Sequence, residues 1–277
     1  DVLAPHNSVP HVHAVLLSGG SAFGLDAASG VMQWLEQHGH GFPVGPVRVP
    51  IVPAAVLFDL NVGDPAIRPD APAGYSACQS ASRKAPAQGN VGAGAGATVG
   101  KVFGPHLAMK GGIGSAALTV SGVTVAALVV VNALGDVVEP KSGRIRAGAR
   151  TTSSGLELQD TVSSLIRGMS KATLPTGANT TIGVIATDAV LSKSQAHRLA
   201  QMGHNGLAQT IRPVHTPWDG DTLFALGTGK SGLPADMMLL STLATEVTAL
   251  AVLSAVAHAE SLRLPSGEWW PCAKDLK

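Results

Sequence analysis

Apolar residues gather in short continuous runs along the chain, a pattern typical of strands that are covered on both faces of a sheet. Valine and isoleucine, which pack well on a pleated surface, are frequent in these runs. Pro50 and Pro53 precede one run and mark it as an edge strand, because proline cannot donate to a central ladder. The runs predict strands at residues 13–17, 54–58, 116–120, 123–131, 135–139, 180–187 and 210–214.

Elsewhere apolar residues recur every three or four positions, which predicts helices at residues 25–37, 192–208 and 242–263. The third is almost wholly Ala, Leu and Val, so we expect it to be buried in the core or against a neighbouring subunit. A shorter helix of small residues follows Pro72 and holds Tyr75 and Cys78. The length of 277 residues suits one large domain or two small ones.

The composition changes at residues 141–178, where Ser, Thr, Gly and basic residues dominate around one amphipathic segment at 156–169. This stretch is predicted to be a linker with some mobility. It ends in the breakers Pro175 and Gly177, directly before the strand that begins at Thr180.

The low charge of the chain adds a prediction about assembly. Hydrophobic residues make up 45% and charged residues 13%, against about 25% charged in a typical soluble domain. We therefore expect a homo-oligomer, with surface covered in subunit contacts. A net charge of +1 gives no reason to expect nucleic acid or an anionic membrane as a partner.

Other features of the composition concern compartment and cofactors. No uninterrupted apolar stretch reaches the roughly 18 residues of a membrane span. Cys78 and Cys272 match no metal or redox spacing and suit a reducing compartment, so we expect a cytoplasmic protein. The histidines lack ligand spacing, so no metal or organic cofactor is expected. Because Asp1 rather than methionine opens the chain, we expect a segment before it.

The candidate nucleophile lies where loop becomes strand, in Asn179-Thr180-Thr181. A cut before Thr180 would place its hydroxyl beside a free α-amine, whose ordinary pKa is about 7.7–8.0. A threonine that uses its own amine as base is a known way to activate a weak hydroxyl. Taken alone, the tripeptide is more typical of a strand cap, and it also fits an N-glycosylation sequon.

Two glycine-rich loops invite a phosphate-binding interpretation, Ser18-Gly-Gly-Ser-Ala-Phe-Gly24 and the stretch at residues 88–101. The first contains neither G-x-G-x-x-G nor a Walker lysine motif. The second, which includes Gly94 and Gly96, follows no strand and has no acidic residue about 20 positions on. Such glycines more often let backbone approach backbone or substrate closely. Lys101 ends the second loop and taken alone is typical of a solvated lysine.

Polar residues at two other strand ends are candidates for a site. Asp219 and Asp221 straddle Gly220, so one turn can aim both carboxylates into a small space, although an Asp-Gly pair alone indicates only a turn. Asn132 ends the apolar run at 123–131, where its amide either bonds the turn or points an N–H into a cleft.

Four phrases together resemble one family, the DmpA-like self-processing hydrolases, which include L-aminopeptidase/D-esterases, β-aminopeptidases and nylon-oligomer hydrolases. They occur in the family's order over almost the whole chain, and begin at Leu17, Gly89, Asn179 and His215: LSGGSAFGL, GNVGAGAG, NTTIGVIAT and HTPWDGDTLFA. The resemblance implies a four-layer α/β/β/α sandwich, also found in ornithine acetyltransferases. It implies one domain over 1–277, cut into subunits 1–179 and 180–277, and assembly into a tetramer or similar oligomer.

Residue roles follow from the same resemblance. Thr180 matches the nucleophile, Asn179–Thr180 the scissile bond, and Asn132 the asparagine at the oxyanion site. Lys101 and the Asp219/Asp221 pair match the nylon-hydrolase branch, because the aminopeptidase branch has serine at the first acidic position. Gly94, Gly96 and Phe58 are expected to line the substrate site; Phe58 replaces a tyrosine of many members, so no hydroxyl is available there.

The resemblance thus predicts a threonine amidohydrolase or aminopeptidase that acts on a small peptide or amide and forms an acyl-enzyme on Thr180. Two alternatives remain open from the sequence. One is acyl transfer of the ornithine-acetyltransferase kind, and the other is an uncut, non-enzymatic binding protein.

Overall fold

A four-stranded sheet forms the centre of the molecule, in a computed structural model that describes residues 2–172 and 179–276. The strand order is β13-β11-β8-β7, with β8 antiparallel to both β7 and β11, and β11 parallel to β13. The strands are β7 (Gly112–Val120), β8 (Val123–Asn132), β11 (Thr180–Thr187) and β13 (Thr222–Gly227). The apolar runs at 123–131 and 180–187 therefore become the two central strands, as predicted.

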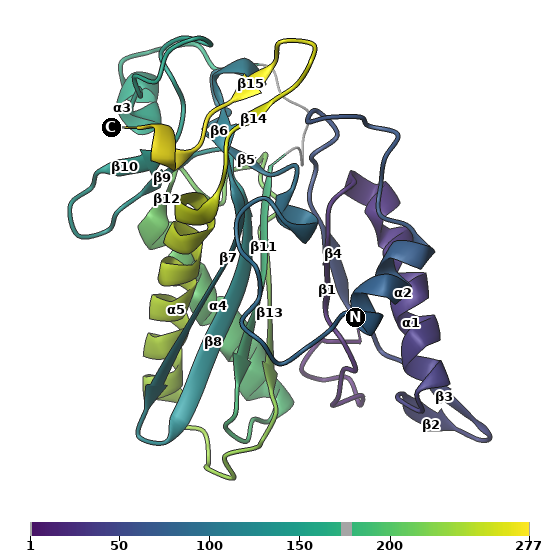
Figure 1. The fold of residues 1–277 in the computed structure, drawn as a ribbon. Coiled ribbons are helices and arrows are strands. Elements are labelled where there is room, and N and C mark those ends of the chain that lie inside the picture. The colour runs from purple at the N-terminus through teal and green to yellow at the C-terminus, as the bar shows by residue number, and fades with distance from the viewer. Residues whose placement is uncertain (1, 173–178, 277) are drawn as a thin grey trace.

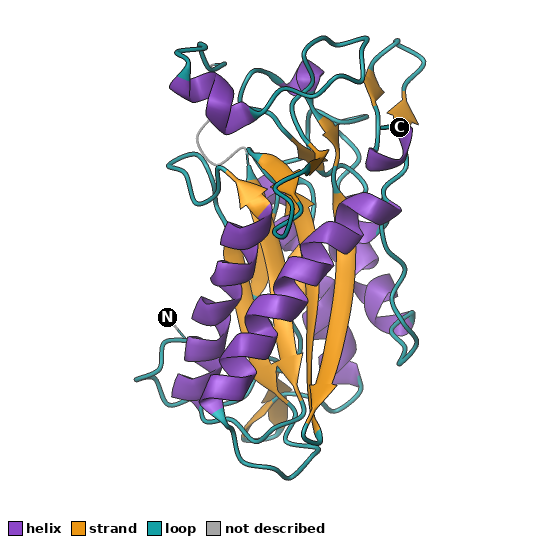
Figure 2. Ribbon diagram, turned by 90° about the vertical axis from the view of Figure 1, so that its left-hand side faces the viewer, coloured by secondary structure: helices purple, strands orange, loops and turns teal. Residues whose placement is uncertain are grey.

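Two long helices cover one face of this sheet, α4 (Lys193–Thr210) and α5 (Met237–His258) (Figure 2). Ser192 and Gln195 form a capping box at the start of α4, and the Asp236 carboxylate caps α5. Gly114 lets α5 approach β7 closely, since a Cβ there would lie 2.1 Å from the carbonyl oxygen of Ala251. The main hydrophobic core fills this interface.

The other face of the sheet carries a second, smaller sheet and its own helices. β1 (Leu16–Ser18) pairs in parallel with β4 (Ala54–Val56), and α1 (Ala27–Gln37) and α2 (Ala71–Gln79) pack outside them (Figure 1). A separate apolar cluster lies between the two sheets, built on four fully buried side chains: Leu57, Ala97, Val130 and Ile182. The order of layers is thus α/β/β/α, which confirms the predicted sandwich.

Short elements complete the fold. They are η1 (Ser21–Asp26), β2 (Phe42–Val44), β3 (Val47–Val49), η2 (Gly92–Gly94), β5 (Thr98–Val99), η3 (Pro105–Leu107), β6 (Met109–Lys110), β9 (Asp136–Val138), β10 (Ile145–Ala147), α3 (Thr161–Ile166), β12 (Ile211–Arg212), β14 (Leu262–Arg263), β15 (Trp269–Trp270) and η4 (Ala273–Asp275). Most of those after η2 gather at one end of the central sheet, above the start of β11 (Figure 1).

The helix predicted at 242–263 is displaced toward the N-terminus. It begins at Met237 because the Asp236 side chain accepts the N–H groups of Met238 and Leu239. It ends at His258, and Leu262–Arg263 forms β14 instead. By length and composition alone, α5 is the one helix in the described part of the chain that could cross a membrane, but 56% of its apolar window is buried inside the protein.

The segment predicted as a linker, 141–178, differs from that expectation over its described part. Its residues 145–147 and 161–166 form β10 and α3. Arg150 between them is fully buried, and its guanidinium donates to carbonyl oxygens of His106, Leu107 and Ser153. The polar composition of this segment predicted mobility, but the buried guanidinium of Arg150 has hydrogen-bond partners inside the protein that hold the segment in place. The end of the predicted linker, 173–178, lies outside the described residues.

Candidate active site

The site is built on the junction of the two central strands. Thr180 is the first residue of β11 and lies opposite Asn132, the last residue of β8. Directly opposed residues of an antiparallel pair have Cβ atoms about 4.5–5.5 Å apart, so these two side chains are neighbours. Both residues are buried, Thr180 with 5% and Asn132 with none of its surface exposed. The structure therefore brings the predicted nucleophile and the predicted oxyanion residue together.

The carbonyl group of Asn179, at the predicted scissile bond, accepts two hydrogen bonds. One comes from the backbone N–H of Gly220 at 2.8 Å and the other from the hydroxyl of Thr180 at 2.6 Å. Asn179 and Asp219 form a parallel β-bridge that brings the two segments together. A Cβ on Gly220 would lie 3.0 Å from Thr180 Oγ1, so glycine leaves room for the hydroxyl. The carbonyl of this peptide bond is thus polarised by a fixed N–H donor.

The acidic pair is held by different partners. Asp219 Oδ2 accepts the N–H and the hydroxyl of Thr216 at 2.8 and 2.7 Å. Asp221 Oδ1 accepts the N–H of Thr181 at 2.7 Å, and its Oδ2 lies 2.8 Å from His215 Nδ1. Burial raises the pKa of Asp219, and the negative charge of Asp221 raises it further. The hydrogen bonds from Thr216 act in the opposite direction and lower it. The Asp219 carboxylate therefore takes up a proton more readily than an ordinary aspartate, because its pKa is raised.

Lys101 is 6% exposed, so the interpretation as a solvated lysine is wrong. Its Nζ donates to Asn132 Oδ1 at 2.7 Å and to the Asn132 carbonyl at 3.1 Å. Burial lowers the pKa of Lys101 to about 7, although the charge of Asp219 acts in the opposite direction. A lysine with this pKa can hold or release a proton near neutrality.

The Asn132 amide is oriented from both ends. Its Oδ1 accepts the Lys101 ammonium and the N–H of Thr98 at 3.0 Å, and its Nδ2 donates to the carbonyl of Phe58 at 2.9 Å. An amide nitrogen carries two N–H donors, so one remains for a reacting oxygen. Phe58 thus supports the site through its backbone, and its side chain is half-buried.

The predicted substrate-site glycines make their close approaches to the protein's own chain. A Cβ on Gly94 would lie 2.5 Å from the backbone nitrogen of Ile113. A Cβ on Gly96 would lie 2.6 Å from the Asp59 carboxylate, which also accepts the N–H of Gly20 at 2.7 Å. Both glycine-rich loops therefore meet close to the site. Contact between Gly94 or Gly96 and a substrate stays a prediction.

Sequence reasoning gave no role to three residues next to the site. Asp59 follows the apolar run that ends at Phe58, and burial raises its pKa. His215 and Thr216 lie in the phrase that carries the family resemblance, and their contacts with the acidic pair depend on the turn geometry. Within the described residues, no group of three or more His, Cys, Asp or Glu side chains is arranged to hold a metal ion.

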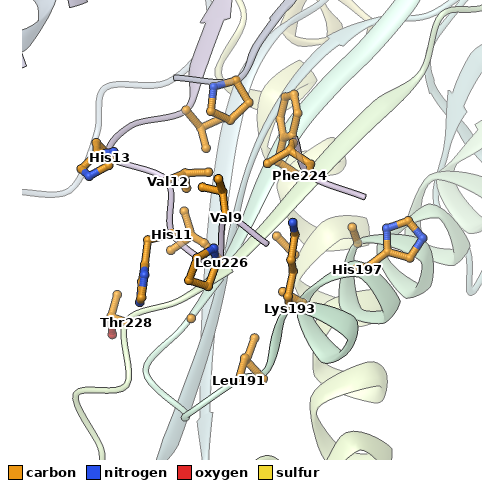
Figure 3. A pocket seen from close by; sticks show the side chains of 18 of the residues that line it. Val9, His11, Val12, His13, Leu191, Lys193, His197, Phe224, Leu226 and Thr228 are labelled. Atoms are coloured by element: carbon orange, nitrogen blue, oxygen red, sulfur yellow. The ribbon is translucent and has the colours of Figure 1, made fainter. Parts of the chain in front are cut away.

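A separate cavity of about 570 Å³ lies along β13 (Figure 3). The N-terminal segment around His11, the first turns of α4 with Lys193 and His197, and β13 with Phe224 and Leu226 line it. None of the predicted site residues is among its lining residues. The candidate active site therefore lies elsewhere, at the Thr180 end of β11.

Comparison with known proteins decides the family. The model of peptidase family S58 matches residues 1–269. The chain belongs to this family. An uncharacterized aminopeptidase of Mycobacterium tuberculosis is 46% identical over 263 residues, which are 93% of this chain and 74% of that protein. A 6-aminohexanoate-oligomer endohydrolase of Paenarthrobacter ureafaciens is 31% identical over 80% of this chain and 62% of its own length.

Two solved structures of aminopeptidases agree in fold with this chain. The L-aminopeptidase D-Ala-esterase/amidase of Ochrobactrum anthropi, described as a variant of the Ntn hydrolase fold, matches 90% of this chain and 67% of that chain with a TM-score of 0.65 at 19% identity. A Burkholderia β-aminopeptidase matches 89% and 68% with a TM-score of 0.60 at 22% identity. The predicted family, its fold and the class of enzyme, a hydrolase, are thereby confirmed.

Proposed function

We propose that this S58 protein cuts its own Asn179–Thr180 bond and then hydrolyses amide bonds of short peptides or peptide-like oligomers through an acyl-enzyme on Thr180. The observation that carries the proposal is the Asn179 carbonyl, which accepts the Gly220 N–H while the Thr180 hydroxyl lies 2.6 Å from the same oxygen. The carbonyl is thus polarised by two donors, and the hydroxyl that we propose as its nucleophile is one of them.

In the uncut chain the α-nitrogen of Thr180 is an amide, so another group must take the hydroxyl proton. Asp219 is our candidate for that role, because a backbone β-bridge holds its segment beside Asn179 and burial raises its pKa. Thr180 Oγ1 attacks the Asn179 carbonyl carbon, the C–N bond breaks, and the proton passes to the departing nitrogen. Water then hydrolyses the ester and leaves a carboxylate on Asn179 and an amine on Thr180.

In the mature enzyme the free amine of Thr180 accepts the hydroxyl proton and returns it to the leaving group of the substrate. The second N–H of Asn132 and the N–H of Gly220 stabilise the oxyanion. Lys101 keeps the Asn132 oxygen turned away from the reacting carbonyl and supplies positive charge close to it. Threonine's branched Cβ restricts χ1, which helps to hold the hydroxyl near its own amine.

The acidic pair and the relatives support a choice of substrates for the first assays. The Asp219/Asp221 pair resembles the nylon-hydrolase branch, and one relative is a 6-aminohexanoate-oligomer endohydrolase. A more similar relative is an uncharacterized aminopeptidase. We therefore propose aminoacyl amides and 6-aminohexanoate oligomers as the substrates to test first.

We also propose that the cleaved protomers form a cytoplasmic homo-oligomer. One face of the β2–β3 hairpin supports the assembly, because its four apolar side chains are 39–50% exposed: Phe42, Val44, Val47 and Val49. Light scattering after size exclusion tests it, and a monomer at micromolar concentration would contradict it.

The test of the proposed reaction is an intact mass of freshly purified protein beside the Thr180→Ala variant. Wild type is expected to give two fragments, the smaller starting Thr-Thr-Ile-Gly, and to hydrolyse an aminoacyl p-nitroanilide. Thr180→Ala is expected to stay whole and inactive. Two fragments from that variant, or an uncut and inactive wild type, would refute the proposal.

A further inference from the structure

The loop between β12 and β13 is closed by two nested sets of side-chain contacts. Thr216 donates to Asp219, and outside this pair His215 Nδ1 lies 2.8 Å from Asp221 Oδ2. The chain between them contains Gly220, whose N–H donates to the Asn179 carbonyl. The shape of this loop therefore sets the position of a donor at the proposed scissile bond.

Asp221 connects this loop to the strand of the nucleophile. Its side chain is 4% exposed, and its two oxygens have different partners, Oδ2 with His215 Nδ1 and Oδ1 with the N–H of Thr181. Thr181 is bonded directly to Thr180. A carboxylate held on both sides cannot rotate without breaking one contact, so His215 fixes the direction from which Asp221 holds the start of β11.

The backbone of His215 is in the left-handed region, with φ of 54°. Most side chains avoid this region, whereas asparagine, aspartate and histidine adopt it several times more often than others. Such backbone persists where the surroundings hold it in place, and it occurs often at functional sites. Here the ring of His204, on α4, packs against the His215 ring with centroids 4.9 Å apart. The Nδ1 atom of His215 contacts Oδ2 of the Asp221 carboxylate.

We propose that His215 is a positioning residue of the hydrolase: its Nδ1–H donates to Asp221, which holds the N–H of Thr181 and thereby the nucleophile. The chain of contacts is His215, Asp221, Thr181, Thr180. A carboxylate accepts only, so Nδ1 carries the proton in this contact. His215 touches no reacting atom, and it acts through Asp221 alone. The inference rests on the function proposed above.

Three variants separate the side-chain donor from the backbone. His215→Asn keeps an N–H donor and tolerates left-handed backbone, His215→Gly tolerates the backbone but has no donor, and His215→Asp has the shape of asparagine without the N–H. Ser121→Gly is the matched control, because Ser121 has φ of 52° in the turn at the far end of β8. Each full-length protein is assayed for its first-order self-cleavage rate, for kcat and KM on an aminoacyl p-nitroanilide, and for its melting temperature.

We expect His215→Gly to lower the self-cleavage rate and kcat about 10–100-fold and to change KM less than about threefold. This range is typical for residues that orient a functional group without touching the substrate. His215→Asn should stay within about threefold of wild type, and Ser121→Gly should match wild type. Glycine at the wild-type rate, or asparagine as slow as glycine at an equal melting temperature, would overturn the inference.

If His215→Gly does not fold, the comparison of His215→Asn with His215→Asp decides, because the two have one shape and one backbone preference. A fast asparagine variant beside a slow aspartate variant of equal melting temperature supports the donor role, because charge repulsion strong enough to distort the loop would also lower the melting temperature. Equal rates refute it. Failure of the proposed function looks different: there the wild type itself neither cleaves nor hydrolyses.

Discussion

Asn132→Asp is the substitution that tests the oxyanion role most directly, because it exchanges one atom. The carboxylate keeps the acceptor that binds Lys101 Nζ at 2.7 Å and the Thr98 N–H at 3.0 Å. The amide nitrogen, which now donates to the Phe58 carbonyl at 2.9 Å, becomes an oxygen. The variant therefore loses both N–H donors of the amide and keeps its shape and its acceptor contacts.

The substitution should lower both the reaction rate and the unfolding free energy. Loss of one oxyanion donor costs about 10²–10³ in rate, which is about 2.7–4 kcal/mol. Two acceptors facing each other at the Phe58 carbonyl leave a buried group unsatisfied, which costs about 1–3 kcal/mol of unfolding free energy. A carboxylate beside Lys101 also stabilises the ammonium form, so we expect the pKa of Lys101 to rise above about 7.

The self-cleavage rate, followed by intact mass from the moment of refolding, is the primary assay because it needs no substrate. Unfolding free energy is measured in the uncut Thr180→Ala background. Asn90→Asp is a matched control, since the Asn90 amide also donates to a carbonyl and accepts an N–H, both of Glu260, outside the site. If Asn132→Asp cleaves itself within about threefold of wild type while Asn90→Asp behaves normally, the oxyanion assignment is refuted.

Three further outcomes are expected. Gly220→Ala puts a Cβ 3.0 Å from Thr180 Oγ1 and should slow self-cleavage about tenfold by displacing the hydroxyl, and an unchanged rate would contradict this contact. Burial lowers the pKa of Lys101 in the folded chain to about 7 from 10.5. Between about pH 7 and 10 the unfolded chain therefore holds a proton that the folded chain has lost, so the unfolding free energy of the uncut chain should rise with pH. Denaturant titrations of Lys101→Met should show a smaller rise. Arg150→Met removes the donors that bind buried carbonyls, including those of His106 and Ser153. It should lower the unfolding free energy by about 3–5 kcal/mol. A decrease of less than about 1 kcal/mol would show that water replaces the guanidinium.

The central strands were predictable because their signals are local, and the cleavage point stays a prediction that rests on the start of one of these strands. Continuous apolar runs need cover on both faces, and Asn179-Thr180 lies at the boundary of such a run. The partner of β11 on its other side, β13, was not predicted; it lies at the sheet edge, and only Leu223 of its six residues is buried. Helix α5 was predicted five residues late because the signal for its start is the cap at Asp236 rather than its apolar content.

The supporting contacts of the site were less predictable, for a physical reason. Lys101 and Arg150 have the sequence surroundings of solvated residues, and only the fold supplies the oxygen atoms that make their burial tolerable. The link from His215 to Asp221 requires a left-handed residue, which no sequence pattern of this segment specifies. Roles that depend on where a loop folds back are set by tertiary structure.

The pairing of β8 with β11 has a consequence for the proposed cut between Asn179 and Thr180. The eight paired positions, from Thr180–Asn132 to Thr187–Val125, would join the two products of that cut along the middle of the sheet. The fragments would then be unable to separate without unfolding the core, and we expect them to remain one particle in dilute solution. Once unfolded, however, they must find each other again, so recovery of the cleaved form becomes a second-order reaction that depends on protein concentration. The uncut chain folds in a first-order reaction that does not depend on concentration. After the proposed cut, the lifetime of the folded protein in dilute solution would be set by its unfolding rate rather than by a reversible folding equilibrium.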